Sequence, residues 1–127
     1  MKRFIYFLSL TFPAIALAGN VVFSCDMVNG KKLLVTDEGE NYQYRFGTIK
    51  KTELVFMNSK NAIDIGISTN GETGEKIKAI DMSNGNYGYT ISSGHSSSGV
   101  TVFNGKTYTT FLCKKNTVVN NIPNILM

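Results

Sequence analysis

Residues 77–92 read IKAIDMSNGNYGYTIS, and this stretch has the pattern of two β-strands joined by a tight turn. Asn84-Gly85 is a dipeptide that readily adopts the positive φ angles of a two-residue hairpin turn. After the turn, Tyr87, Tyr89 and Ile91 occupy alternate positions, which places them on one face of a strand. The stretch therefore predicts an antiparallel β-hairpin.

The rest of the chain repeats this pattern. Asn-Gly recurs at 29–30, 70–71 and 104–105, and strand-like runs lie around these turns at a spacing of about ten residues. No long stretch has the period of an amphipathic helix with a cap at each end. The predicted strands are 21–25, 32–36, 42–46, 53–57, 63–67, 77–82, 87–92, 99–103 and 107–113. We expect an all-β fold, a small antiparallel meander of about eight short strands closed into a barrel, with a β-sandwich as the alternative.

The N-terminal residues have the composition of a signal peptide. Lys2 and Arg3 precede an apolar run, and Ala16-Leu17-Ala18 supplies the small residues that signal peptidase requires. The run is shorter than the ~20 residues that a transmembrane helix needs. We expect cleavage after residue 18 and a periplasmic location, with secretion as an alternative. Attachment of a lipid to Cys25 is a further alternative, which the bulky Phe23 disfavours.

Length and composition limit the protein to one domain. The chain has 127 residues, of which 43% are hydrophobic and 17% charged, and this excludes a collagenous, low-complexity or strongly disordered protein. We expect a signal peptide at 1–18, a β-barrel domain at 19–115 and a C-terminal tail at 116–127. The tail is a packed segment, an additional edge strand or disordered. Nothing in it indicates a membrane span.

The basic residues give no indication of nucleic-acid binding. The formal net charge is +4, but Lys2 and Arg3 belong to the predicted signal peptide. The remaining lysines include three adjacent pairs, at 31–32, 50–51 and 114–115, and form no long run.

The chain has two cysteines, Cys25 and Cys113, near the two ends of the predicted domain. In an exported protein, two cysteines most simply form one disulfide. We expect the bond to tie the first predicted strand to the last, where closure of the barrel would also remove two exposed sheet edges. Two thiols and the single distant His95 do not make a four-ligand metal site.

The sequence contains no recognisable catalytic constellation and implies no cofactor. His95 lies among serines and glycines without a nucleophile-elbow sequence. The acidic cluster Asp37, Glu38 and Glu40 has the composition of a solvated turn. An enzyme is therefore the function that we rank last.

Two segments are candidates for contact with a partner. The first is the small, polar loop between two predicted strands, in which we single out Ser93, Gly94, His95, Ser98 and Gly99. The second is the strand that contains Tyr44 and Arg45, because a guanidinium between aromatic side chains can stack on a partner group. The simpler interpretations are a solvated hairpin loop and a half-buried strand with Arg45 on its outer face.

The chain resembles the small periplasmic or membrane-bound inhibitors of C-type lysozyme of Gram-negative bacteria. The resemblance rests on the order of its features: a signal peptide, a cysteine in the first strand, a meander of short strands and a cysteine in the last strand. The resemblance implies a compact eight-stranded barrel with a Ser-Gly-centred loop that enters the lysozyme cleft and meets the catalytic carboxylates. Ser98-Gly99 is the nearest match to that Ser-Gly. The family has a Tyr three residues after the Gly, where this chain has Val102.

These observations favour an exported binding protein that neutralises a protein partner. A lysozyme would be one such partner, and a cell-wall-active toxin, with the chain as an immunity-like protein, would be another. The alternative is a carrier that holds a small ligand in an apolar barrel interior.

Overall fold

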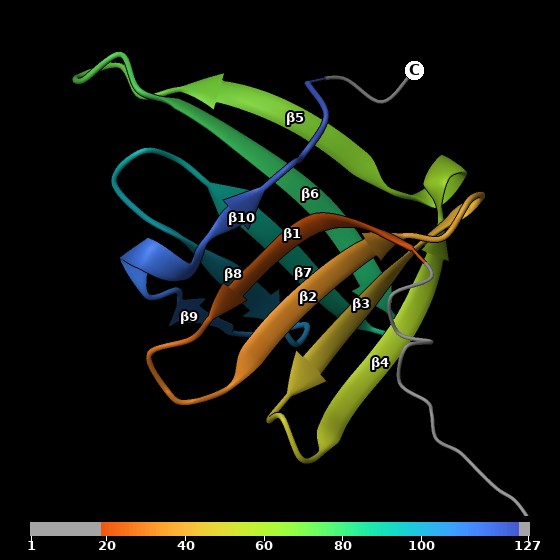
Figure 1. The fold of residues 1–127 in the computed structure, drawn as a ribbon. Coiled ribbons are helices and arrows are strands. Elements are labelled where there is room, and N and C mark those ends of the chain that lie inside the picture. The colour runs from red at the N-terminus through yellow and green to blue at the C-terminus, as the bar shows by residue number, and fades with distance from the viewer. Residues whose placement is uncertain (1–18, 125–127) are drawn as a thin grey trace, which may run out of the picture.

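The structure is a computed structural model that describes residues 19–124 (Figure 1). The predicted signal peptide, residues 1–18, lies outside the described residues, as do residues 125–127 of the predicted tail.

The described chain folds into two five-stranded antiparallel sheets with strand orders β10-β1-β2-β3-β4 and β5-β6-β7-β8-β9. The strands are β1 (Asn20–Asp26), β2 (Lys32–Asp37), β3 (Asn41–Gly47), β4 (Thr52–Ser59), β5 (Asp64–Thr69), β6 (Lys76–Asn84), β7 (Tyr87–Ser93), β8 (Ser98–Phe103), β9 (Tyr108–Leu112) and β10 (Val119–Asn120). Two short 3-10 helices, η2 (Lys60–Ala62) and η3 (Lys115–Thr117), link β4 to β5 and β9 to β10. The predicted all-β, antiparallel architecture is confirmed.

Each predicted strand run forms a strand, and three of the four Asn-Gly pairs form the predicted turns with a left-handed glycine. Gly85, for example, has φ 64° between β6 and β7. The turn at Asn70-Gly71 differs from the prediction. There the Asn70 side chain accepts hydrogen bonds from the backbone N–H groups of Glu72 and Thr73, and Gly74, at φ 75°, has the left-handed conformation. The loop between β5 and β6 is therefore longer than a two-residue turn.

The segment after residue 115 adds an edge strand to the first sheet. β10 pairs with β1, with Phe23 opposite Asn120 and Ser24 opposite Val119. Beyond β10, the side chain of Ile122 is buried in the core. Along β1 the partner on this side is thus β10, and the expected pairing of the first strand with the last is limited to one antiparallel bridge, between Met27 and Cys113.

Contacts outside the two strand ladders also join the sheets, among them an antiparallel bridge between Met27 and Cys113. At the end of β1, the backbone N–H of Val28 donates to Leu112 O (3.0 Å), and that of Lys114 donates to Asp26 O (2.7 Å). The disulfide between Cys25 and Cys113 lies beside these bonds and confirms the predicted pairing. Elsewhere, the Asn58 side chain donates to Ser83 O and accepts from Ser83 N–H, both at 2.8 Å. Within the described residues, neither sheet closes on itself.

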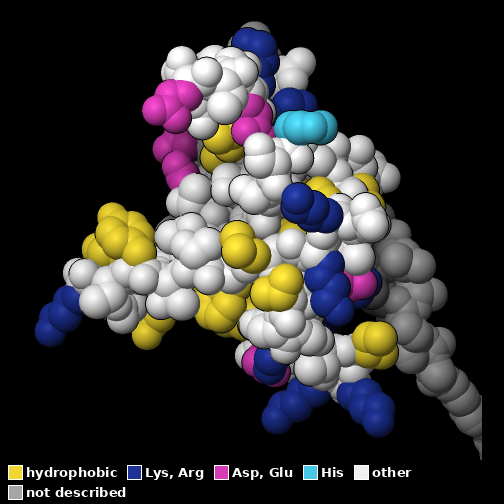
Figure 2. All heavy atoms as spheres, turned by 90° about the vertical axis from the view of Figure 1, so that its left-hand side faces the viewer, with side chains coloured by type: hydrophobic (Ala, Val, Ile, Leu, Met, Phe, Trp, Pro, Cys, Tyr) yellow, Lys and Arg dark blue, Asp and Glu magenta, His cyan; other side chains and the backbone are white. Residues whose placement is uncertain are grey.

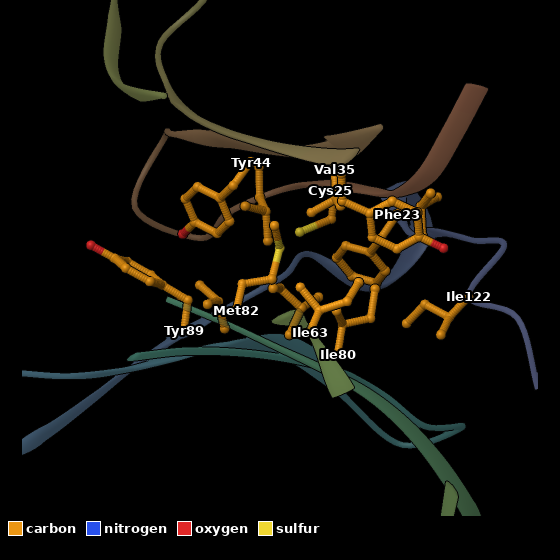
Figure 3. Packing of buried hydrophobic residues seen from close by; sticks show 14 of the residues in the cluster. Phe23, Cys25, Val35, Tyr44, Ile63, Ile80, Met82, Tyr89 and Ile122 are labelled. Carbon is orange, nitrogen blue, oxygen red and sulfur yellow. The ribbon is translucent and has the colours of Figure 1, made fainter. Parts of the chain in front are cut away.

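The hydrophobic core lies between the sheets (Figure 3). Phe23, Val35 and Tyr44 from the first sheet point toward Ile80, Met82 and Tyr89 from the second. The rings of Tyr44 and Tyr89 lie 5.0 Å apart. Full burial of each such side chain contributes about 1.5–3 kcal/mol, so packing of the two sheets on each other stabilises the fold.

Candidate functional site

The loop between β7 and β8 is a closed hairpin turn. Ser93 and Ser98 are opposite each other at its base, and their hydroxyl oxygens share a hydrogen bond of 2.8 Å. The backbone N–H of Gly94 donates to Ser97 O (2.9 Å) and closes the turn. Both Ser93 and Ser98 are buried, with exposed fractions of 4% and 8%. These hydroxyls therefore bond to each other, and neither is presented at the surface.

A second contact fixes the tip of the loop. The backbone N–H of Ser96 donates to Glu75 Oε2 (2.7 Å), and the Ser96 hydroxyl donates to Glu75 Oε1 (2.9 Å). These two hydrogen bonds, with smaller contributions from His95, lower the pKa of the Glu75 carboxyl. Glu75 precedes β6, so the loop of one hairpin is tied to the loop of its neighbour.

The two glycines of the predicted site have structural roles. A Cβ at Gly94 would lie 2.5 Å from Glu75 Oε2, in the path of the contact just described. A Cβ at Gly99 would lie 2.3 Å from the carbonyl oxygen of Phe111 on β9. Gly94 thus lets Glu75 approach the loop, and Gly99 lets β8 and β9 pair closely.

The exposed part of the loop is its tip, formed by His95, Ser96 and Ser97. On one side of the tip is a cleft of about 250 Å³, which extends to Cys113 and Lys115. A cleft of about 340 Å³ on the other side is lined by residues 73–76 together with His95 and Ser96. His95 and Ser96 line both clefts, so a partner that enters either cleft would contact the tip.

The sequence analysis identified His95 at this tip but missed Ser96 and Ser97. The signal was present in the strand register: a four-residue turn closed at Ser93 and Ser98 leaves residues 94–97 outside the ladder. The hydrogen bonds between Glu75 and Ser96 had no such signal in the sequence, because they join two loops that are distant along the chain.

The second predicted segment lies on the other sheet, away from the loop. Tyr44 is only 1% exposed and stacks on Phe56 with ring centroids 4.8 Å apart, and burial raises the pKa of its hydroxyl. Strand alternation thus places the Tyr44 ring in the core, where it is not accessible to a partner in this structure. Arg45 points the other way, where its guanidinium donates to Thr52 Oγ1 and Gln43 Oε1, both at 3.3 Å.

Two further observations concern metal sites and membrane-spanning helices. Residues 19–124 contain no group of three or more His, Cys, Asp or Glu side chains placed to hold a metal ion. In the same part of the chain, no helix is long and apolar enough to cross a membrane.

The geometry of the 94–97 loop is the main structural indication of function, because comparison with known proteins gives no indication of function. No protein-family model matches the chain, and searches of curated proteins and of solved structures return no match to it.

Proposed function

We propose that this chain is an exported binding protein that neutralises a protein partner, such as a lysozyme or a cell-wall-active toxin, by presenting the 94–97 loop. The observation that carries the proposal is the double anchoring of that loop, by the Ser93–Ser98 bond at its base and by Glu75 at its tip. A loop already held in one conformation loses less entropy when it binds.

The scaffold supports the same function. The disulfide and the backbone bonds around Lys114 join the two sheets into what we propose is one barrel-like body. A small-ligand carrier needs an interior cavity, but large side chains such as Phe23, Tyr44 and Met27 fill the space between the sheets. A filled interior favours recognition through the surface. The disulfide also fits an oxidising compartment, and we propose the periplasm.

The direct test is inhibition of a C-type lysozyme by the purified protein, measured as lysis of a cell-wall suspension. A pulldown of secreted and periplasmic hydrolases extends the test to other partners. Ser97→Arg places a large charged side chain at the exposed tip, and we expect it to weaken inhibition at least about tenfold, as expected for the loss of central interface contacts. The matched control is Asn86→Arg, which lies in the exposed turn at the opposite end of β7.

The outcomes separate the possibilities. Inhibition or capture that Ser97→Arg abolishes and Asn86→Arg leaves intact supports the loop as the binding site. Equal effects of the two variants would move the site elsewhere. Absence of both inhibition and capture would remove the proposal.

A further inference from the structure

Two of the three adjacent lysine pairs, and one lysine of the third pair, lie at one end of the first sheet. The β1–β2 turn at this end contains Lys31, and Lys32 begins β2 directly after it. The β3–β4 turn contains Lys50 and Lys51. Lys114 joins them, because its backbone N–H bonds to Asp26 O at the end of β1, next to the disulfide. We call these five lysines the basic end. Figure 2 shows Lys and Arg side chains gathered over the lower part of one face, with hydrophobic side chains among them.

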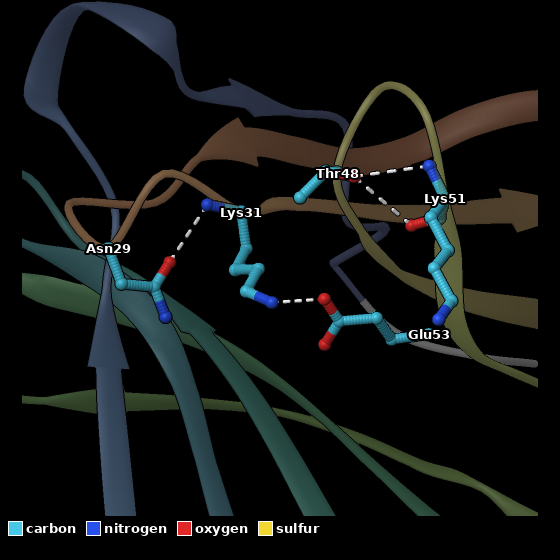
Figure 4. Close-up of polar contacts among 5 residues, drawn as sticks. All are labelled: Asn29, Lys31, Thr48, Lys51 and Glu53. Atoms are coloured by element: carbon cyan, nitrogen blue, oxygen red, sulfur yellow. Dashed lines mark hydrogen bonds and ion pairs between the residues drawn. The ribbon is translucent and has the colours of Figure 1, made fainter.

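Local contacts hold the two turns in place (Figure 4). An ion pair between Lys31 and Glu53 connects the first turn to the start of β4. Asn29 Oδ1 accepts from the backbone N–H of Lys31 (2.9 Å), and Thr48 Oγ1 accepts from that of Lys51 (3.1 Å). The basic end is therefore a structured surface of two neighbouring turns.

The positive charge of this surface is only partly neutralised. Lys31 pairs with Glu53 and Lys32 with Asp26. Among residues 19–124, no carboxylate forms an ion pair with Lys50, Lys51 or Lys114. The acidic residues Asp37, Glu38 and Glu40 lie around the β2–β3 turn, which antiparallel topology places at the opposite end of the same sheet. The first sheet thus has one basic and one acidic end, so an anionic surface attracts the basic end and repels the acidic end.

Both turns of the basic end also expose an apolar side chain. Ile49 is 93% exposed in the β3–β4 turn, directly before Lys50, and Val28 is 64% exposed in the β1–β2 turn. Ile49 lines a surface cleft of about 250 Å³ together with Lys31, Lys32 and Lys114, so apolar and cationic groups share one surface. Exposed β-branched side chains at projecting turns have no role in the core of the fold.

We propose that the basic end docks on the surface of an anionic lipid bilayer. Ile49 and Val28 enter the boundary between headgroups and acyl chains, while the lysines remain among the lipid phosphates. An acidic protein surface would complement the lysines, but it would not account for an apolar side chain at the tip of each turn. This inference is independent of the loop at 94–97.

The test is binding of the oxidised protein, purified from cells that express the full chain, to phosphatidylcholine vesicles with and without phosphatidylglycerol. We expect binding only to the anionic vesicles, with loss at high salt. Lys50→Gln with Lys51→Gln should weaken binding by about tenfold or more. Ile49→Ser should weaken it by about tenfold. The matched controls, Lys76→Gln with Lys106→Gln and Ile67→Ser, change exposed residues of the second sheet and should leave binding within about twofold.

The chain contains no Trp, so Ile49→Trp gives a unique fluorescent reporter. Its emission should shift to shorter wavelength on anionic vesicles, whereas that of Ile67→Trp should not. No binding to anionic vesicles, or equal losses in the variants and their controls, would overturn the proposal. Full binding by Ile49→Ser, with binding abolished in the double lysine variant, would also overturn it, because purely electrostatic binding does not distinguish a bilayer from a soluble polyanion or an acidic protein.

Discussion

At the scale of single residues, Glu75 holds the tip of the candidate binding loop. Its two carboxylate oxygens accept both hydrogen bonds of Ser96, and no other side chain bonds to the tip within the described residues. A carboxylate accepts hydrogen bonds better than a protonated carboxyl group does. The two bonds therefore favour the ionised form and lower the pKa of Glu75 below 4.5. The order of the loop is thereby linked to the protonation of one group.

This linkage predicts a loop that loosens in acid. Because the folded-state pKa is lowered, the stabilisation is present above the usual pKa of a glutamate and is lost as the pH falls through the folded-state value. The measurement is amide exchange and chemical shift of Ser96 by NMR as a function of pH. Glu75→Gln keeps an acceptor but should abolish the pH dependence. An unchanged Ser96 titration in that variant would contradict the assignment to Glu75.

At the scale of elements, close pairing of β8 with β9 depends on Gly99. The two strands pair from Gly99 opposite Leu112 to Phe103 opposite Tyr108, and a side chain at Gly99 would meet the Phe111 carbonyl. The glycine of the Ser98-Gly99 pair is therefore required by strand packing in this chain. Whether or not the pair meets a partner, its glycine positions the strand that follows the loop.

Gly99→Ala should accordingly lower the free energy of unfolding by about 1–3 kcal/mol, because the backbone of β9 must shift to accommodate the methyl group. The matched control is Gly66→Ala in β5, where the added Cβ has no atom within 4 Å. We expect the control to be neutral or slightly stabilising, since alanine restricts the unfolded chain. Urea denaturation of both variants provides the comparison. Equal effects would show that the approach of β8 and β9 is not the cause.

At the scale of the whole molecule, the disulfide joins the two sheets across a sequence separation of 88 residues. It lies beside the bonds from Val28 and Lys114, and so holds the end of β1 against the end of β9. The same bond positions Lys114 at the basic end. One covalent link thus supports both the fold and the proposed docking surface.

Replacing both cysteines by alanine should lower the free energy of unfolding by about 4–5 kcal/mol, the value that chain entropy assigns to a closed loop of this length. Denaturation in urea, with the reduced unmodified protein as a second sample, measures the loss. The native protein should contain no reactive thiol, because Cys25 and Cys113 are its only cysteines. Unchanged stability, or two free thiols in exported material, would contradict the role of the bond.

The sequence by itself determined the local structure of this protein. Alternating side chains and Asn-Gly pairs are short-range signals, so they located the strands and most turns, and the presence of only two cysteines left one intramolecular pairing. Alternation also placed Tyr44 and Arg45 on opposite faces, but only packing against Phe56 and Tyr89 decided that the Tyr44 face is the core. Long-range contacts alone decided the division into two sheets, the pairing of β10 with β1, the contact of Glu75 with Ser96 and the position of Lys114 at the basic end. No local pattern specifies these contacts, because each depends on how distant segments share one core.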